Sequence, residues 1–216
     1  CFGGPDRAAP GFTPFQKAVN YAMTAPLTTG GIRGSNKPMD TYLPRSFNMG
    51  FRRDVWQTVG GLRPGMQPGE DLDFSLRIRN AGFQVAYIPE AWVYHKRKTS
   101  VRHFFRQMKA FGRARVQLSQ LHPGQMKPMH LAPLVFTLGL LFAIMCLAIP
   151  ALLPGYGFML ALPYVYAFYL IAVYLHSTSQ NSSAWVGALS VQATVIMFVG
   201  YGLGLFQGFA QPKATP

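Results

Sequence analysis

The 216-residue sequence predicts an α/β sheet domain, followed by an interfacial amphipathic helix and three transmembrane helices. The distribution of charge is the first observation behind this prediction. Residues 128–212 contain no Asp, Glu, Lys or Arg, and every charged residue except Lys213 precedes them. The second observation is that short strand-like segments alternate with helix-like segments in the polar half, as in α/β sheets. The chain is therefore a polar, basic half followed by an apolar half.

The apolar half contains three runs, at about 131–153, 158–175 and 185–206. Each is long enough as a helix to cross the hydrocarbon core of a bilayer, which is about 30 Å thick. Short polar turns are expected between them, at 154–157 and 176–183. A transporter or channel is disfavoured, because the runs contain no ionisable residue apart from flanking histidines.

The segment just before the first run is strongly basic. Nine Lys and Arg residues and no acid lie within 91–127. This excess predicts that the soluble part lies on the cytoplasmic side of an inner or plasma membrane, in a multi-pass protein. Three crossings would then place Lys213 on the far side. Anionic lipid explains the net charge of +13 better than nucleic acid does, since the basic residues adjoin a membrane span.

The polar half is expected to contain three short helices, one small-residue loop and three strands. The N-cap of the second helix is predicted to be Asp54, and Gly60–Gly61 should end that helix. The helices are predicted at Pro14–Ala25, Asp54–Val59 and Glu70–Asn80, the loop at Thr28–Ser35, and the strands at Ser46–Arg53, Phe83–Ile88 and Trp92–His95. The first strands of the sheet are missing, and the chain opens without Met or a signal peptide, so we expect it to be the C-terminal piece of a longer protein.

Val101–Leu121 has apolar residues at helical spacing and basic residues mainly on the rest of the wheel. An amphipathic helix with a basic face, placed just before a membrane span, is expected to lie in the interface plane. The alternative is an ordinary surface helix packed on the sheet.

Three of the seven acids are clustered at Glu70, Asp71 and Asp73. Clustering scarce carboxylates costs like-charge repulsion, which a base or metal site at a helix start would explain. The simpler interpretation is that the helix dipole favours acids in a first turn.

Five modest motifs occur in an order that resembles the C-terminal portion of a membrane-anchored bacterial family-2 glycosyltransferase with the GT-A fold. The resemblance covers roughly residues 1–130. The motifs begin with Gly3-Gly4-Pro5 together with Phe15–Ala18 and Thr28–Gly31, and continue with Asn48–Trp56 together with Val59–Leu62, Gly69–Asp73 together with Arg77 and Gly82, Pro89–His95, and Phe105–Arg115. The acidic motif by itself would be much weaker support.

This resemblance implies an inverting transfer of sugar from a nucleotide-sugar, with Asp71 as the general base and Glu70 as a second catalytic residue. It implies that Asn48, Gln107 and Arg113 contact the substrate and that His95 contributes to a divalent metal site, for Mg or Mn. The acceptor would be a lipid-linked or cell-surface glycan, such as a polyprenyl-linked one. The family's first half, with its Asp-x-Asp metal motif, has no counterpart here, so we expect this chain alone not to bind a sugar nucleotide or to be active.

Four residues each fit two roles. Asp73 fits both an exposed first-turn acid and a functional one, and His95 fits both a metal or diphosphate contact and a surface residue near lipid headgroups. Trp56 and Trp92 fit stacking on a sugar ring, although the core is the commoner place for Trp.

The alternative to an enzyme is a non-catalytic membrane anchor that binds anionic lipid or a partner protein through its basic helix. The acidic cluster favours the enzyme, because an anchor has no use for acids beside a basic face. The predicted divisions are 1–99 for the partial GT-A domain, 100–127 for the amphipathic helix and linker, and 128–216 for the transmembrane region.

Overall fold

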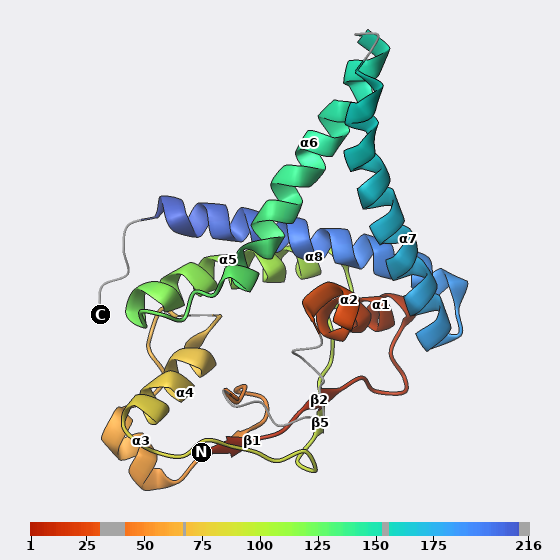
Figure 1. Cartoon of the computed structure of the whole chain (residues 1–216). Helices are drawn as coiled ribbons and strands as arrows, with labels where there is room; N and C mark the ends of the chain where they lie inside the picture. Colours follow the sequence, from red (N-terminus) through yellow and green to blue (C-terminus); the bar gives the residue numbers. More distant parts are fainter. Residues whose placement is uncertain (31–41, 67, 153–155, 212–216) are drawn as a thin grey trace.

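Three tiers of structure follow one another in space (Figure 1). Small strands and short helices form the tier that holds the N-terminus, further helices lie between that tier and a long C-terminal helix, and a helical hairpin projects away from the long helix. The computed structural model describes residues 1–30, 42–66, 68–152 and 156–211. Parts of the predicted loop at Thr28–Ser35 and of the turn at 154–157, and the tail with Lys213, lie outside the described residues.

The strands are shorter than predicted. β3 (Met49–Gly50) and β4 (Ala86–Tyr87) flank β1 (Phe2–Gly3), antiparallel and parallel respectively, and β5 (Val93–Tyr94) pairs in parallel with β2 (Asp6–Arg7). β1 and β2 are each two residues long, and the other strands pair with them. The paired part of each predicted strand is therefore also two residues long. The fold is therefore a mixed helical one with small sheets.

The helices of the polar half begin close to the predicted positions. α1 (Pro14–Thr24) begins with a capping box in which Thr13 and Gln16 satisfy each other's backbone amides, and α2 (Pro26–Thr29) follows it. The N-cap position of α3 (Arg53–Val59) is occupied by Arg52, whose side chain makes no capping hydrogen bond, so the prediction of Asp54 as N-cap is wrong. Asp54 lies in the first turn, where the helix dipole stabilises its negative charge.

α4 (Glu70–Asn80) and α5 (Val101–Leu121) have the predicted bounds. Gly69 precedes α4 in a left-handed conformation (φ 115°) that favours glycine, and the Ser100 side chain caps α5. Phe74 and Ile78 of α4 are buried against Val55 of α3. Packing of α4 on α3 places the acidic first turn at the surface that faces α5.

The apolar half forms α6 (Ala132–Leu152), α7 (Ala161–Asn181) and α8 (Ala184–Ala210), with 3-10 turns η1 (Pro128–Leu131) and η2 (Gly157–Leu160) before the first two. All three are long and apolar enough to cross a membrane. The predicted turn at 176–183 is wrong for most of its length, since α7 continues to Asn181. The reason is tertiary, because buried Ser177 bonds Ser190 of α8 and His176 bonds the hydroxyl of Tyr21.

α5 packs on α8 at very short range. A Cβ built on Gly204 would lie 2.1 Å from the Lys109 carbonyl oxygen, and one built on Gly112 would lie 2.2 Å from that of Tyr201. Farther along the same face, Met108 and Phe104 of α5 join Ala193 and Met197 of α8 and buried residues of α1 in one core cluster. This packing fixes the position of α5 above the first turn of α4.

Candidate active site

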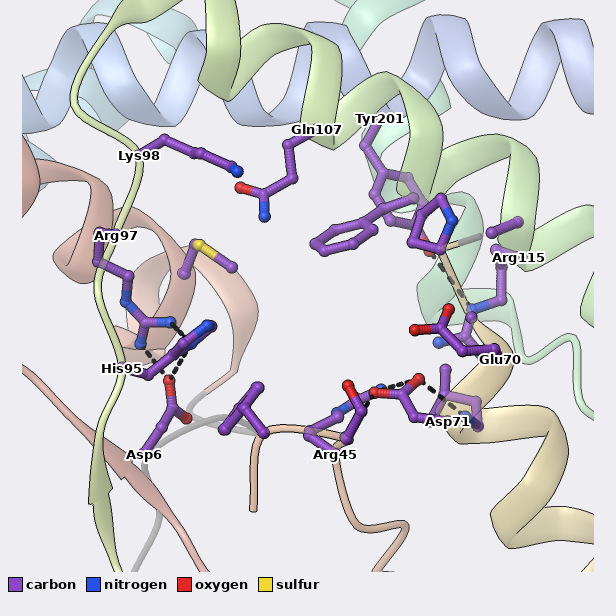
Figure 2. A pocket seen from close by; sticks show the side chains of 18 of the residues that line it. Asp6, Arg45, Glu70, Asp71, His95, Arg97, Lys98, Gln107, Arg115 and Tyr201 are labelled. Carbon is purple, nitrogen blue, oxygen red and sulfur yellow. Dashed lines mark hydrogen bonds and ion pairs between the residues drawn. The ribbon is translucent and has the colours of Figure 1, made fainter. Parts of the chain in front are cut away.

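A cavity of about 280 Å³ lies where the first turn of α4, the end of β5, α5 and α8 meet (Figure 2). Its lining includes four of the six residues predicted for the site, namely Glu70, Asp71, His95 and Gln107. These residues come from three separate parts of the sequence, which the packing of α5 over α4 brings together.

Asp71 lines the cavity and is 14% exposed at its side chain. Its Oδ1 accepts from the backbone amide of Leu72 (2.8 Å), and its Oδ2 accepts from that of Ser46 (3.3 Å). A guanidinium nitrogen of Arg45 lies 4.0 Å from Oδ1. The carboxylate is therefore held in place by neutral donors with one cation nearby, an arrangement that leaves lone pairs for a proton from a substrate.

Glu70 also lines the cavity, and its Oε2 is buried with no hydrogen-bond partner among the described residues. A buried carboxylate oxygen without a donor is costly, so it is a place where a substrate donor would be favoured. Glu70 differs in this way from Asp71, whose two oxygens both accept backbone hydrogen bonds.

Cations that the sequence did not single out also line the cavity. They are Arg45 beside Asp71, Arg115 beside Glu70, and Arg97 and Lys98 across the cavity from these (Figure 2), with Tyr201 of α8 next to Arg115. Nε of Arg115 donates to the Tyr201 hydroxyl over 3.4 Å. A cavity in which cations lie beside and across from two carboxylates can bind an anionic group next to a group able to accept a proton.

His95 is held in a cluster at the end of β5. The buried guanidinium of Arg97 lies 2.6 Å from Oδ2 of Asp6 and 3.2 Å from Nδ1 of His95, and that carboxylate oxygen is 3.5 Å from the same Nδ1. Nε and Nη2 of Arg97 also donate to Asn20 of α1. The His95 ring stacks on Phe47, with ring centroids 3.9 Å apart.

These residues do not fit a divalent cation by themselves. In the described ranges, no three His, Cys, Asp or Glu side chains form a group able to hold a metal ion. The guanidinium of Arg97 contacts both Asp6 and His95, so a positive charge already lies between the two ligands that the cluster offers. The Mg or Mn site therefore remains a prediction that would need ligands beyond this cluster.

The remaining two predicted residues do not line the cavity. The amide of Asn48 donates to the Ala91 carbonyl (2.7 Å), so it links β3 to the turn before β5, and Arg113 is exposed on α5. Trp56 and Trp92 are 41% and 38% exposed, so the expectation that they belong to the core is wrong. Trp92 instead lies under the Arg7 guanidinium, 4.4 Å from it.

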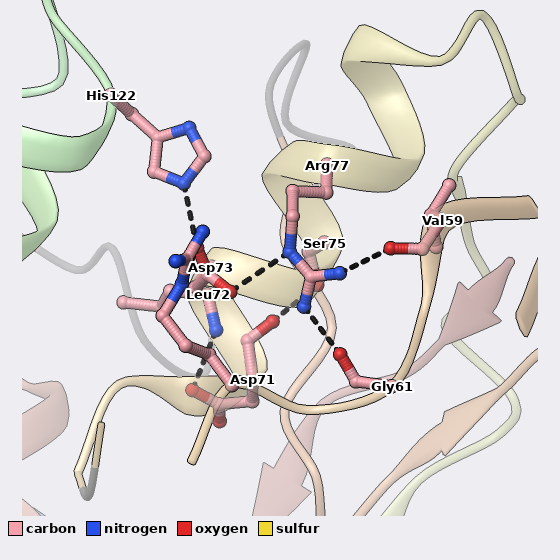
Figure 3. Close-up of polar contacts among 9 residues, drawn as sticks. Val59, Gly61, Asp71, Leu72, Asp73, Ser75, Arg77 and His122 are labelled. Atoms are coloured by element: carbon pink, nitrogen blue, oxygen red, sulfur yellow. Dashed lines mark hydrogen bonds and ion pairs between the residues drawn. The ribbon is translucent and has the colours of Figure 1, made fainter. Parts of the chain in front are cut away.

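Asp73 is fully buried, which excludes the exposed first-turn acid (Figure 3). Its Oδ2 accepts from Nε of Arg77 (2.9 Å), and its Oδ1 lies 2.9 Å from Nε2 of His122 and 3.6 Å from Nε of Arg63. Arg77 in turn donates to the carbonyls of Val59 and Gly61. Asp73 thus connects α4 to the end of α5 and to the turn after α3.

Burial raises the pKa of Asp73, but the hydrogen bonds from His122 and Arg77 and the charges of Arg77 and Arg63 outweigh it. The net result is a pKa below the ordinary Asp value. The carboxyl is therefore ionised and fully used by its neighbours, so it has a structural role beneath the cavity.

A second cavity, of about 360 Å³, adjoins the first and is lined mostly by apolar side chains. Arg45, Arg115 and Tyr201 line both cavities. The second cavity reaches the start of α6 through Met129 and Pro133. The polar cavity that Asp71 lines therefore adjoins, across Arg45, Arg115 and Tyr201, an apolar cavity at the base of the hairpin.

The residues that sequence reasoning missed carry little signal of their own. Arg97 and Lys98 belong to a basic segment whose composition indicates contact with lipid headgroups, and Tyr201 belongs to an apolar segment. Their positions in the cavity depend on the packing of α1 and α8 on α5, which no local pattern reports.

Comparisons with known proteins identify a family. Residues 46–175, more than half of the chain, match the model of glycosyl transferase family group 2. The succinoglycan biosynthesis protein ExoA of Rhizobium meliloti is 29% identical over 140 residues, which are 62% of this chain and 42% of that protein. The pre-mycofactocin glycosyltransferase of Mycobacterium tuberculosis is 33% identical over 92 residues, which are 43% of this chain and 18% of that protein.

The chain spans less than half the length of these relatives. No solved structure matches it. The family match includes the acidic first turn of α4, the end of β5, all of α5 and α6, and most of α7. By this match the chain belongs to glycosyl transferase family group 2.

Proposed function

We propose that the protein transfers a sugar from a nucleotide-sugar donor to a hydroxyl group of a glycan acceptor, with Asp71 as the general base. The observation that carries this proposal is the position of Asp71, whose largely buried carboxylate faces a cavity that also contains Gln107 and several cations. An alcohol is a poor nucleophile, so a carboxylate within hydrogen-bond reach is needed to take its proton as the new bond forms.

In the proposed step, the acceptor oxygen forms a bond to the anomeric carbon while the bond from that carbon to the diphosphate oxygen breaks. The acceptor proton passes to a carboxylate oxygen of Asp71, and the nucleoside diphosphate leaves with the bonding electrons. Attack from the side opposite the leaving group inverts the anomeric carbon. Glu70, with an unpartnered oxygen in the same cavity, is placed to accept a hydrogen bond from the acceptor.

The leaving diphosphate gains negative charge during this step. Lys98, Arg45 and Arg115 line the same cavity and would stabilise that charge. Arg97 is already paired with Asp6, so it is better suited to hold His95 in place than to bind phosphate. We assign Gln107 to substrate contact, whereas Asn48 and Arg113 lie outside this cavity.

We further propose that the acceptor is lipid-linked, such as a polyprenyl-linked glycan. The second cavity supports this, because it is apolar, adjoins the first one and reaches the base of the apolar hairpin. An acceptor with an anionic group near Arg45 and Arg115 and an apolar chain in the second cavity would present its sugar hydroxyl to Asp71. A cytoplasmic position for this face follows the excess of Lys and Arg before the first apolar helix.

The Asp71→Asn variant of the full-length enzyme tests the central assignment. It should lower turnover by about 100- to 10,000-fold, the usual contribution of a general base. Donor affinity, measured by isothermal titration calorimetry, should stay the same, since the base acts on the acceptor. Asp54→Asn is the matched control, because Asp54 is an exposed acid in the first turn of α3 and should leave turnover unchanged.

Wild-type turnover in Asp71→Asn would remove Asp71 from the base role.

The acceptor class is tested by comparing one saccharide with and without a polyprenyl diphosphate. Met129→Glu, which puts a charge into the second cavity, should raise KM for the lipid-linked form alone. An equal effect on both forms would contradict a lipid site in that cavity.

A further inference from the structure

α8 has the length and composition of a membrane span, but its packing differs from that of a span. One side of the helix contacts α1 and α5 over most of its length. Ala193 and Met197 share a core cluster with α1 and the first half of α5, and Gly204 and Gly208 lie against Gly112 and Val116 of α5. The order of these contacts shows that α5 and α8 run side by side in the same direction.

α5 carries charge at the level of these contacts. Arg106, Lys109, Arg113 and Arg115 belong to the stretch of α5 that faces Gly200–Gly208 of α8. Arg102, Arg106 and Arg113 are exposed. If α8 crossed the bilayer, this stretch of α5 would be carried into the hydrocarbon with it, where each cation is costly. α1, which contacts the other half of α8, would be drawn in as well.

α6 and α7 meet α8 in a different way. The hydroxyl of Thr137, one turn into α6, donates to the Phe198 carbonyl, and Ser177 near the end of α7 bonds Ser190. Beyond these contacts the hairpin exposes large apolar side chains, among them Phe142, Phe158 and Phe168. In Figure 1, α6 and α7 rise away from α8 on the side opposite α1 and the strands. The hairpin therefore has the exposed apolar surface that lipid-crossing helices need.

Near both of its ends, the outward side of α8 is exposed and mostly apolar. Trp185, Leu203 and Phe206 are exposed at 65%, 38% and 64%, and they fall on one stripe of the helix with exposed Ala188 and Gln192, while the residues between Gln192 and Leu203 are buried or half-buried. α8 contains no charged residue. A helix whose one side rests on protein and whose other side presents aromatic and aliphatic side chains suits the plane of the membrane interface.

We propose that only α6 and α7 cross the membrane, and that α8 lies along the membrane surface with its Trp185–Phe206 stripe in the lipid. Two crossings place the end of α8 on the same side as α1–α5. This differs from the three crossings that composition predicts, which would put the residues after α8 on the opposite side. The lipid surface is thus the partner of α8, and α8 is the platform that holds α5 and Tyr201 over the cavity.

Single-cysteine labelling distinguishes the two topologies. In the full-length protein with its native cysteines replaced by alanine, we would introduce Gln211→Cys after α8, Gln57→Cys on α3 and Tyr156→Cys between α6 and α7, all at exposed positions. A membrane-impermeant maleimide is applied to vesicles of each orientation. Gln57→Cys and Tyr156→Cys report the two sides of the membrane.

If α8 lies in the plane of the membrane, Gln211→Cys should be labelled in the vesicles in which Gln57→Cys is labelled. It should not be labelled in vesicles of the opposite orientation. Labelling of Gln211→Cys together with Tyr156→Cys would overturn the proposal. A depth profile gives a second, independent measurement, from nitroxide labels at Trp185, Gln192 and Phe206. Similar depths are expected at all three, whereas a label at Gln192 far deeper than the other two would show a crossing helix.

Discussion

At the scale of single residues, two aspartates that are two positions apart have different surroundings. Successive residues of a helix are rotated by about 100°, so Asp71 and Asp73 point to different sides of α4. Asp71 faces the cavity, and Asp73 is buried under it with Arg77 and His122. The cluster that looks like one motif in the sequence is thus a candidate catalytic group next to a structural one.

Asp73→Asn tests the structural role. The substitution keeps the shape but removes the charge that Arg77, Arg63 and His122 share, and breaking a buried charge pair costs about 3 kcal/mol. We expect the melting temperature of the detergent-solubilised protein to fall by roughly 5 to 10 °C. Asp54→Asn, on an exposed ion pair, should change it little. Equal melting temperatures for the two variants would contradict this role of Asp73.

Asp73 also predicts a dependence of stability on pH. Its pKa is lower in the folded protein than the ordinary value of 3.8, so its stabilising effect is fully present above that value and is lost as the pH falls through the folded pKa. The difference in melting temperature between wild type and Asp73→Asn should therefore be constant near neutral pH and shrink below pH 3.8. Thermal unfolding followed from neutral pH downward measures it. A difference that grows with acid would mean that the pKa is raised instead.

At the scale of elements, helical periodicity gave the bounds of α4 and α5, because each has a clear start signal and a regular apolar face. The strands were overestimated, since a β-propensity run reports nothing about the length of its partner strand. The turn predicted at 176–183 failed for a related reason. Its polar residues continue α7 because Ser177 and His176 find partners on α8 and α1.

Close contact between α5 and α8 leads to a prediction at this scale. Gly204→Ala would put a methyl group 2.1 Å from a backbone oxygen of α5, which cannot move aside as a side chain can. We expect a loss of about 1 to 3 kcal/mol of stability, with reduced turnover because Gln107 and Tyr201 lie on the two helices. Gly11→Ala, where an added Cβ meets nothing within 4 Å, is the control for thermal unfolding and activity assays. Unchanged stability in Gly204→Ala would mean that the helices are farther apart.

At the scale of the whole molecule, the site is only partly readable from the sequence. Glu70, Asp71, His95 and Gln107 belong to local motifs, and they line one cavity. Arg115 and Tyr201 line it together only when α5 packs on α8, a contact between positions 86 residues apart. Composition likewise identifies α8 as apolar, but it does not give the orientation of α8 relative to the membrane. That orientation depends on which parts of the protein pack against each side of the helix.

The divisions predicted at 1–99, 100–127 and 128–216 follow changes in amino-acid composition along the chain. One hydrophobic core cluster contains residues from all three segments. Val19 of α1 and Phe104 of α5 are fully buried in one cluster with Ala193 of α8. A chain ended after Lys127 would expose this cluster, and burial of such side chains contributes about 1.5 to 3 kcal/mol each. We therefore expect the truncated chain to aggregate or to be digested rapidly by protease in detergent.

The matched control keeps α8 and shortens only the hairpin, by replacing 138–172 with a flexible linker. This variant retains the contacts of Thr137 and Ser177 with α8, and it should protect α1–α5 from protease as well as the intact chain does. Size-exclusion chromatography and limited proteolysis compare the two. If the chain ended after Lys127 were monomeric and fully protected, α8 would be a dispensable anchor. If only the shortened-hairpin chain were protected, α8 would be part of the catalytic unit, whatever its apolar composition indicates.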